Sequence, residues 1–285
     1  MALERVRDAC DVTERVTRDP VGVVRRYADP RDREIVALVA SSLAFGNVTT
    51  IRAKVDEALD RIGPVPSAAH GDPDGVARRL RGFVHRVYKG ADLAKLVIGA
   101  SRVQERHGTM GAFFEARFAE SGDLREALVA LVAAIREAGG FGARGSRDAA
   151  GRPRERGAEH LLPDPSKGSG AKRLLLFLRW MIRPDDGVDL GMWNVPARAL
   201  LVPVDTHIHK LARNLGFTDA SGVTWKAAVE ITASLRRLDP EDPAKYDFSL
   251  CHLGMLQRCP SRKDPGRCEG CGVLPVCRHW QIVRR

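Results

Sequence analysis

The sequence predicts an all-α protein. Ala, Leu, Arg and Glu are abundant, and strand-like runs of alternating β-branched and aromatic residues are scarce. Apolar residues instead recur every three or four positions, which is the spacing of a helix with one buried face. The chain has 285 residues, of which 44% are hydrophobic, so it has enough apolar side chains for one large or two small folded domains.

The expected helices follow one another with short breaks. A turn at Gly46-Asn47 divides residues 32–61 into two helices, and Pro64 ends the second. Residues 73–88 are basic, and we interpret most of their charges as a solvated helix face. In chain order, the expected helical segments are residues 1–30 (one or two short helices), 32–61, 73–88, 91–107, 109–119, 123–138, 171–183, a helix that begins after Asp205, 224–238 and 242–256.

Two neighbouring stretches depart from this pattern in opposite ways. Residues 139–170 are rich in Gly, Arg and Pro and show no periodicity, which predicts a long mobile loop or insertion. Residues 171–183, AKRLLLFLRWMIR, are apolar on most sides and therefore predict a buried helix.

The charge of the chain favours an anionic partner. The net charge is +10, and nucleic acid is the simplest polyanion that such a protein binds, although many basic proteins have no such partner. Apolar runs of transmembrane length and a signal-peptide core are absent from the sequence, so we expect a cytoplasmic protein with no membrane partner. In that compartment, clustered cysteines indicate a metal more often than disulfides.

Five of the six cysteines lie between Cys251 and Cys277. Four of them have the spacing Cys259-x8-Cys268-x2-Cys271-x5-Cys277. Four thiolates in such a loop can hold either a [4Fe–4S] cluster or a structural zinc ion. Cys251 and Cys10 fit the pattern of small buried apolar residues instead.

The loop that carries these cysteines is basic. A basic loop that is held in shape by a metal predicts a surface that binds a polyanion, most simply the phosphate backbone of DNA. Its cationic residues are Arg258, Arg262, Lys263 and Arg267.

Two residues can carry chemistry. Asp205 lies directly before a helix and fits an N-cap, and the same cap would hold its second oxygen toward a cleft. Lys172 lies in the first turn of the buried 171–183 helix, where the helix N-terminus and the adjacent Arg173 both disfavour a charged ammonium. A neutral amine is what a Schiff-base nucleophile needs. An ordinary cap and a solvated lysine are the simpler interpretations, and Lys167 is a weaker alternative nucleophile.

Several further residues have a functional and a structural interpretation. Phe45 and Asn47, at the break of the early helix pair, can enter the gap left by a displaced base, whereas core packing is the slightly preferred interpretation for Phe45. His207 can orient Asp205 or lie on the surface of its helix. Three aspartates can bind magnesium, but turn and capping roles explain them more simply. They are Asp185, Asp186 and Asp189.

Together these stretches resemble the endonuclease III family of DNA glycosylases, which have a helix-hairpin-helix fold. The cysteine tail has the same x2 and x5 spacings, and VPVDTHIHKLARNLG is similar to the segment that carries the catalytic aspartate. IVALVASSLAFGNVTTIRAKVDEAL resembles the early helix pair that brings a DNA-inserting residue to the cleft. The similarity covers most of residues 32–277, with 62–170 only generically helical.

The chain departs from that family at its hairpin. The family string Leu-Pro-Gly-x-Gly with a following lysine is absent, and the first cysteine gap is longer than usual. A buried helix with Lys172 near its start, well before Asp205, is more similar to archaeal-type 8-oxoguanine DNA glycosylases. That resemblance implies an oxidised base as substrate, with 8-oxoguanine first and oxidised pyrimidines second.

The resemblance implies two helical domains and a mechanism. Residues 35–199 would form a barrel domain with the 139–170 insertion, and 1–34 plus 200–285 would form the domain that carries the cysteine loop. A monomer would flip a damaged nucleotide out of double-stranded DNA in the nucleoid. Lys172 would attack the sugar C1′ and form a Schiff base, with β-elimination to follow, while Asp205 helps to deprotonate it and stabilises the developing positive charge.

Two other functions remain open from the residues alone. One is a non-catalytic DNA-binding protein in which the metal loop is a structural staple. The other is a monofunctional glycosylase in which water is the nucleophile and Lys172 is dispensable.

Overall fold

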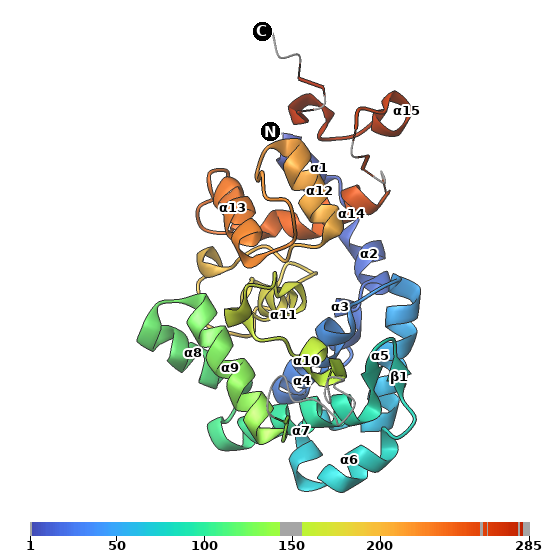
Figure 1. Cartoon of the computed structure of the whole chain (residues 1–285), viewed down its shortest axis with the longest axis vertical. Coiled ribbons are helices and arrows are strands. Elements are labelled where there is room, and N and C mark those ends of the chain that lie inside the picture. The colour runs from blue at the N-terminus through green and yellow to red at the C-terminus, as the bar shows by residue number, and fades with distance from the viewer. Residues whose placement is uncertain (1, 143–155, 257–258, 261, 279, 282–285) are drawn as a thin grey trace, which may run out of the picture. The chain divides into compact units, whose positions relative to one another are not determined.

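A computed structural model of the chain describes residues 2–142, 156–256, 259–260, 262–278 and 280–281. These residues are mostly helical, and the two strands have two residues each, so the all-α prediction is confirmed (Figure 1). The α-helices are α1 (Ala2–Asp8), α2 (Val12–Arg18), α3 (Val21–Val24), α4 (Pro30–Leu43), α5 (Val48–Ile62), α6 (Pro73–Arg79), α7 (Gly90–His107), α8 (Met110–Ser121), α9 (Leu124–Ala138), α10 (Arg156–Leu161), α11 (Lys172–Ile182), α12 (Thr206–Leu215), α13 (Trp225–Arg236), α14 (Asp247–Leu256) and α15 (Pro265–Cys268). The 3-10 helices are η1 (Pro66–Gly71), η2 (Pro165–Lys167), η3 (Ala197–Ala199), η4 (Pro243–Tyr246) and η5 (Leu274–Val276). No helix in the described ranges has the length and apolar character needed to cross a membrane.

The predicted helix over residues 73–88 is wrong in its second half. Helix α6 ends at Arg79, and an antiparallel hairpin of β1 (Val84–His85) and β2 (Tyr88–Lys89) follows. Gly82 has φ +81°, and Arg86 at the hairpin turn has φ +54°. Both values lie in the left-handed region, which a right-handed helix cannot contain.

The predicted loop over residues 139–170 is also only partly right. Residues 156–161 form α10 and residues 165–167 form η2, whereas 143–155 lie outside the described residues. Ala158, Leu161 and Leu162 are fully buried. The surrounding glycines and arginines conceal this short apolar face in the sequence.

The chain forms two compact units, each made of separate segments. Unit 1 contains Met1–Val12, Gly168–Arg179 and Pro196–Arg285, and unit 2 contains Thr13–Lys167 and Trp180–Val195. The expected division placed residues 13–34 with the C-terminal part of the chain, and residues 168–179 and 196–199 with the barrel domain, so it differs at these three segments. Most of α11, including its start at Lys172, therefore belongs with the C-terminal helices.

Unit 2 is organised around the buried carboxylate of Glu34 on α4. Its two oxygens accept hydrogen bonds from Gln104 Nε2 and from the backbone N–H groups of Met110 and Gly111, at 2.8, 2.8 and 2.9 Å. Trp193 Nε1 donates a fourth bond of 2.8 Å. A buried charge is tolerated when several donors replace its hydration, so Glu34 joins α4 to α7, α8 and the segment after α11.

Unit 1 packs α14 against α12 and α1, and α13 against η4. The predicted buried face of α12 is observed at Ile208, Leu211 and Ala212. This packing fixes the starts of α12 and α14, which carry the carboxylates of the candidate site.

Replacing Glu34 with Gln should destabilise the protein, because the amide turns one acceptor of the buried cluster into a donor. We expect the free energy of unfolding in urea to fall by about 2–3 kcal/mol. Glu120→Gln is the control, since Glu120 pairs with Arg117 on the surface, and it should change stability by less than about 0.5 kcal/mol. Equal effects of the two substitutions would contradict the role of Glu34.

Candidate active site and cysteine loop

Lys172 is the first residue of α11 and follows a tight turn. Ser169 pairs with Thr224 in an isolated antiparallel bridge, and Gly170 lies against Val223. Ala171 has φ +43°, a left-handed conformation that disfavours any residue with a Cβ atom. The chain therefore enters α11 through a constrained turn, which fixes the direction in which Lys172 leaves the backbone.

Asp205 has both of the roles considered for it. It caps α12, where its Oδ1 accepts the backbone N–H groups of His207 and Ile208, each at 2.9 Å. Its Oδ2 lies 3.7 Å from Lys172 Nζ. One oxygen holds the helix and the other faces the amine.

The Lys172–Asp205 pair is partly open to solvent. The two side chains are 30% and 24% exposed, and their separation exceeds a normal hydrogen bond. The amine is thus held mainly by charge and remains accessible. An amine beside a carboxylate can lose its proton to that carboxylate and act as a nucleophile.

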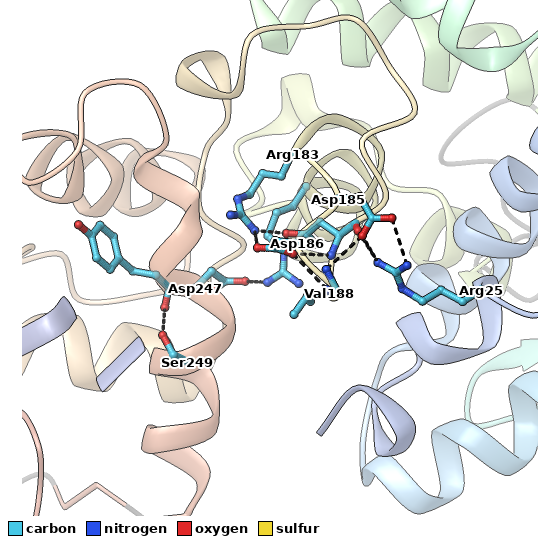
Figure 2. A network of polar contacts seen from close by, with 11 residues as sticks. Arg25, Arg183, Asp185, Asp186, Val188, Asp247 and Ser249 are labelled. Atoms are coloured by element: carbon cyan, nitrogen blue, oxygen red, sulfur yellow. Dashed lines mark hydrogen bonds and ion pairs between the residues drawn. The ribbon is translucent and has the colours of Figure 1, made fainter. Parts of the chain in front are cut away.

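A second ion pair lies further along α11. Arg179, seven residues after Lys172, pairs with Asp247 at the start of α14 (Figure 2). The two side chains are only 3% and 5% exposed. Burial and the charge of Asp205 raise the pKa of Asp247 to about 6, against the opposing charges of Arg179 and Lys172. This pair was not predicted from the sequence, although an arginine inside the apolar run LLLFLRWMI indicates that a buried partner exists.

The aspartates of the loop after α11 have partners in unit 2. Asp185 pairs with Arg25 at 2.7 Å, and Arg183 pairs with both Asp186 and Asp189 (Figure 2). Asp185 and Asp186 also accept backbone N–H groups within the loop. These contacts agree with the turn and capping interpretation of the three aspartates.

The four cysteines of the predicted metal site line one cavity in unit 1. The cavity is bounded by Cys259, Cys268, Cys271 and Cys277 together with Leu211, Asn214 and Trp280. Burial raises the pKa of the Cys259 thiol, as do the other three cysteines, while a 3.2 Å hydrogen bond from Asn214 Nδ2 acts in the opposite direction. Among the described residues, no three His, Cys, Asp or Glu side chains are grouped tightly enough to hold one metal ion. The four cysteines are nevertheless gathered around one cavity.

The basic residues of this loop are exposed where the structure describes them. Lys263 Nζ lies 4.2 Å from the centre of the Trp280 ring, and Arg267 pairs with Asp264 at 3.4 Å. Arg262 is exposed as well, whereas Arg258 lies outside the described residues. His207 is exposed at the start of α12.

The break between α4 and α5 presents an exposed aromatic residue. Phe45 is 42% exposed, so the slightly preferred core interpretation is wrong. The guanidinium of Arg86 lies 5.0 Å from its ring centre, and His160 meets it edge-on at 5.3 Å. Asn47 is exposed and caps α5 through bonds to Thr49 N and Thr50 N. Arg86 and His160 were not predicted, because their approach to Phe45 depends on the hairpin and on α10.

Comparison with known families places the chain in one of them. Residues 19–256 match the family described as "Protein of unknown function (DUF2400)", so the chain belongs to that family. The match includes Lys172, Asp205, Arg179 and Asp247 and ends before Cys259. No curated protein and no solved structure matches the chain.

The pKa of Asp247 predicts a pH dependence of stability. A carboxyl whose pKa is raised in the folded state binds its proton more tightly there than in the unfolded chain, where the value is 3.8. Its contribution to stability is therefore present below about pH 4 and is lost as the pH rises through about 6. Between these pH values, the unfolding free energy of the unmodified protein should fall by about 3 kcal/mol relative to that of Asp247→Asn.

Urea unfolding at intervals of half a pH unit measures this difference. Asp219→Asn, at an exposed pair with Arg278, should follow the unmodified protein. Parallel curves for the unmodified protein and Asp247→Asn would show that Asp247 titrates as an ordinary carboxyl.

Proposed function

We propose that the protein is a DNA base-excision glycosylase of the helix-hairpin-helix superfamily with lyase activity. Its proposed substrate is double-stranded DNA with an oxidised base, 8-oxoguanine first and an oxidised pyrimidine second. The observation that carries the proposal is the position of Lys172 Nζ 3.7 Å from Asp205 Oδ2, with Asp205 capping α12. These are the two residues to which the sequence resemblance assigns nucleophile and carboxylate.

The pair can carry out the chemistry in a balanced sequence. Lys172 transfers a proton to Asp205, and its free electron pair attacks C1′ of the damaged nucleotide. The glycosidic bond breaks, and the base leaves with the bonding electrons and takes up the proton that Asp205 received. Asp205 is then a carboxylate again and opposes the positive charge that develops on the sugar. The nitrogen, now bonded to C1′, passes a proton to the ring oxygen O4′ as the C1′–O4′ bond breaks, which gives the protonated imine between Lys172 and C1′. Loss of a proton from C2′ to a base then expels the 3′ phosphate by β-elimination.

The turn before α11 supports the superfamily assignment. Gly168-Ser169-Gly170 is a Gly-x-Gly turn with Lys172 two residues later. This turn lacks the Leu-Pro part of the family string Leu-Pro-Gly-x-Gly but has the same order of glycines and lysine.

The exposed basic and aromatic residues support DNA as the partner. Phe45 and Arg86 in unit 2 offer a ring and a guanidinium for base stacking, with Asn47 beside them. The tail of unit 1 offers Lys263 and Arg267 for phosphate contact, and Arg262, Arg258 and His207 complete the proposed DNA-binding residues. The net charge of +10 adds a non-specific attraction that salt would weaken.

The cysteine cavity fits a metal centre by its donor set. Four thiols with few other polar groups around them suit a [4Fe–4S] cluster, with structural zinc as the alternative. Cys259, Cys268, Cys271 and Cys277 would hold it, and the group would staple the basic loop rather than take part in base excision. The positive charge of the metal would stabilise four neighbouring thiolates, which would otherwise repel one another.

Borohydride trapping on lesion-containing duplexes tests the mechanism. Reduction of the imine should join the protein covalently to 8-oxoguanine DNA, and Lys172→Ala should abolish the adduct because the nucleophile is gone. Lys167→Ala is the matched control, since Lys167 is exposed and lies five residues earlier, and it should retain the adduct. Asp205→Asn should reduce the rate by at least about 100-fold.

The same experiment separates the two alternative functions. Base release without a covalent adduct, if it is retained in Lys172→Ala, would indicate a monofunctional enzyme that uses water. Intact DNA binding with no adduct and no base release on any lesion would indicate a DNA-binding protein without catalytic activity.

Metal analysis tests the cysteine loop. Protein purified without oxygen should be brown with broad visible absorbance and should contain about four iron atoms per chain. Cys271→Ser should lose the colour and the iron, whereas Cys251→Ser, which lies outside the four-cysteine set, should keep both. A colourless protein with one zinc ion per chain would establish the zinc alternative, and a metal-free, folded protein would refute the assignment.

A further inference from the structure

Trp280 places a hydrogen bond donor beside the cysteine cavity. The residue lines the cavity together with Cys259, Cys268, Cys271 and Cys277. Its indole Nε1 is buried, and no described residue accepts a hydrogen bond from it. A buried donor without an acceptor destabilises a folded protein, and buried indoles usually find one, as Trp193 does with Glu34. The orphaned N–H therefore agrees with a ligand that supplies an acceptor in this cavity.

The indole ring is held in place by two contacts from the segment that carries the cysteines. The Trp280 backbone N–H donates to the Cys277 carbonyl oxygen at 2.9 Å, so a tight turn links the ring to the last cysteine. Lys263 Nζ lies over the ring, 4.2 Å from its centre, in a cation–π contact. Because this contact covers one face of the ring, turning the N–H away from the cavity would cost the protein that attraction.

The acceptors that the cavity can offer to this N–H are chiefly sulfur atoms. Apart from the cysteines, the cavity is lined by apolar residues and by Asn214 and Arg267. Asn214 Nδ2 already donates to Cys259 Sγ at 3.2 Å and to the Pro260 carbonyl oxygen at 3.1 Å, and a guanidinium has donors only. A neutral thiol is a weak acceptor, whereas a metal-bound thiolate or sulfide carries negative charge and forms stronger hydrogen bonds. Trp280 therefore fits the metal-bound form of the cavity better than a form with four thiols.

We infer that Trp280 Nε1 donates a hydrogen bond to a sulfur of the [4Fe–4S] cluster proposed for this loop and thereby raises the reduction potential of that cluster. One-electron reduction adds one negative charge to the iron and sulfur atoms. A donor at sulfur stabilises the reduced form more than the oxidised form, so it favours reduction. Asn214 Nδ2 supplies a second donor of the same kind at Cys259. The inference rests on the proposed function only in taking this cluster as the metal centre.

The reduction potential measures the effect of this hydrogen bond. Anaerobic full-length protein is titrated with dithionite in the presence of redox dyes, and the reduced cluster is quantified by electron paramagnetic resonance. Trp280→Phe should keep its iron and its colour. Its equilibrium constant for reduction should fall about fivefold, the usual effect of one hydrogen bond, which lowers the potential by about 40 mV. Trp225→Phe is the matched control, because Trp225 begins α13 outside the cavity lining, and it should leave the potential unchanged.

The sign of the shift separates a hydrogen bond from packing. A smaller ring at position 280 that only admitted water would raise the potential, because water stabilises the more highly charged reduced form. Benzothienylalanine at position 280 has sulfur in place of the indole N–H and keeps the shape of the ring. It should lower the potential as much as Trp280→Phe does. An unchanged or raised potential with benzothienylalanine would overturn the inference.

NMR of the unmodified protein tests the bond directly and covers the case in which the variants lose the cluster. A proton that is hydrogen-bonded to a cluster sulfur acquires unpaired spin density through the bond, so its resonance shifts and depends on temperature. With ¹⁵N-labelled indoles, the Trp280 N–H should show this behaviour. Trp180 is the internal reference, because its Nε1 is also buried without an acceptor among the described residues but lies in unit 2. Identical temperature dependence of the two resonances, or zinc in place of iron, would overturn the inference.

These outcomes are independent of base excision. A lowered potential in both position-280 variants with no borohydride adduct on any lesion would refute the proposed enzyme while the role of Trp280 stands. A normal adduct with an unchanged potential, or with zinc in the cavity, would refute the role of Trp280 while the proposed enzyme stands.

Discussion

The start of α12 depends on Asp205, and much of unit 1 depends on that helix. The first N–H groups of a helix lack partners within it, and Asp205 Oδ1 supplies one for both His207 and Ile208. This cap orients the carboxylate rigidly, because rotation of the side chain would break both bonds. Oδ2 is thereby held toward Lys172 at 3.7 Å. The helix cap and the carboxylate of the candidate site are therefore the same side chain. The cap holds the second oxygen in a fixed position near Lys172.

The other end of α12 reaches the cysteine loop. Asn214, near the C-terminus of the helix, donates to Cys259 Sγ and to the Pro260 carbonyl oxygen, and its own carbonyl accepts the N–H of Arg278. The helix is thus held by Asp205 at one end and by the loop at the other.

Much of this organisation could be predicted from the sequence, and the exceptions have physical causes. Helical periodicity identified α4, α5, α7, α9 and α13, since each buries one regular face. The β1–β2 hairpin was missed because its turn uses Arg86 in a left-handed conformation, where glycine or asparagine would have been the usual signal. Lys172 and Asp205 were found from local patterns at helix starts. Asp247 was not found, because its partner is 68 residues away and nothing local distinguishes it from a solvated first-turn aspartate.

Arg179 is the residue in the sequence that indicates a buried ion pair. Arg179 stands within an apolar run on a helix whose other neighbours, Leu178 and Trp180, are fully buried. A guanidinium in such a place must find a carboxylate or several carbonyl oxygens, because it cannot lose its charge. The carboxylate that pairs with this guanidinium is buried as well. Burial raises the pKa of that carboxyl, and nearby charges shift it further. The nearest such charges on α11 and α12 are those of Lys172 and Asp205. A charge that the sequence places in an apolar helix therefore indicates a buried partner of opposite charge, which here is Asp247 at the start of α14.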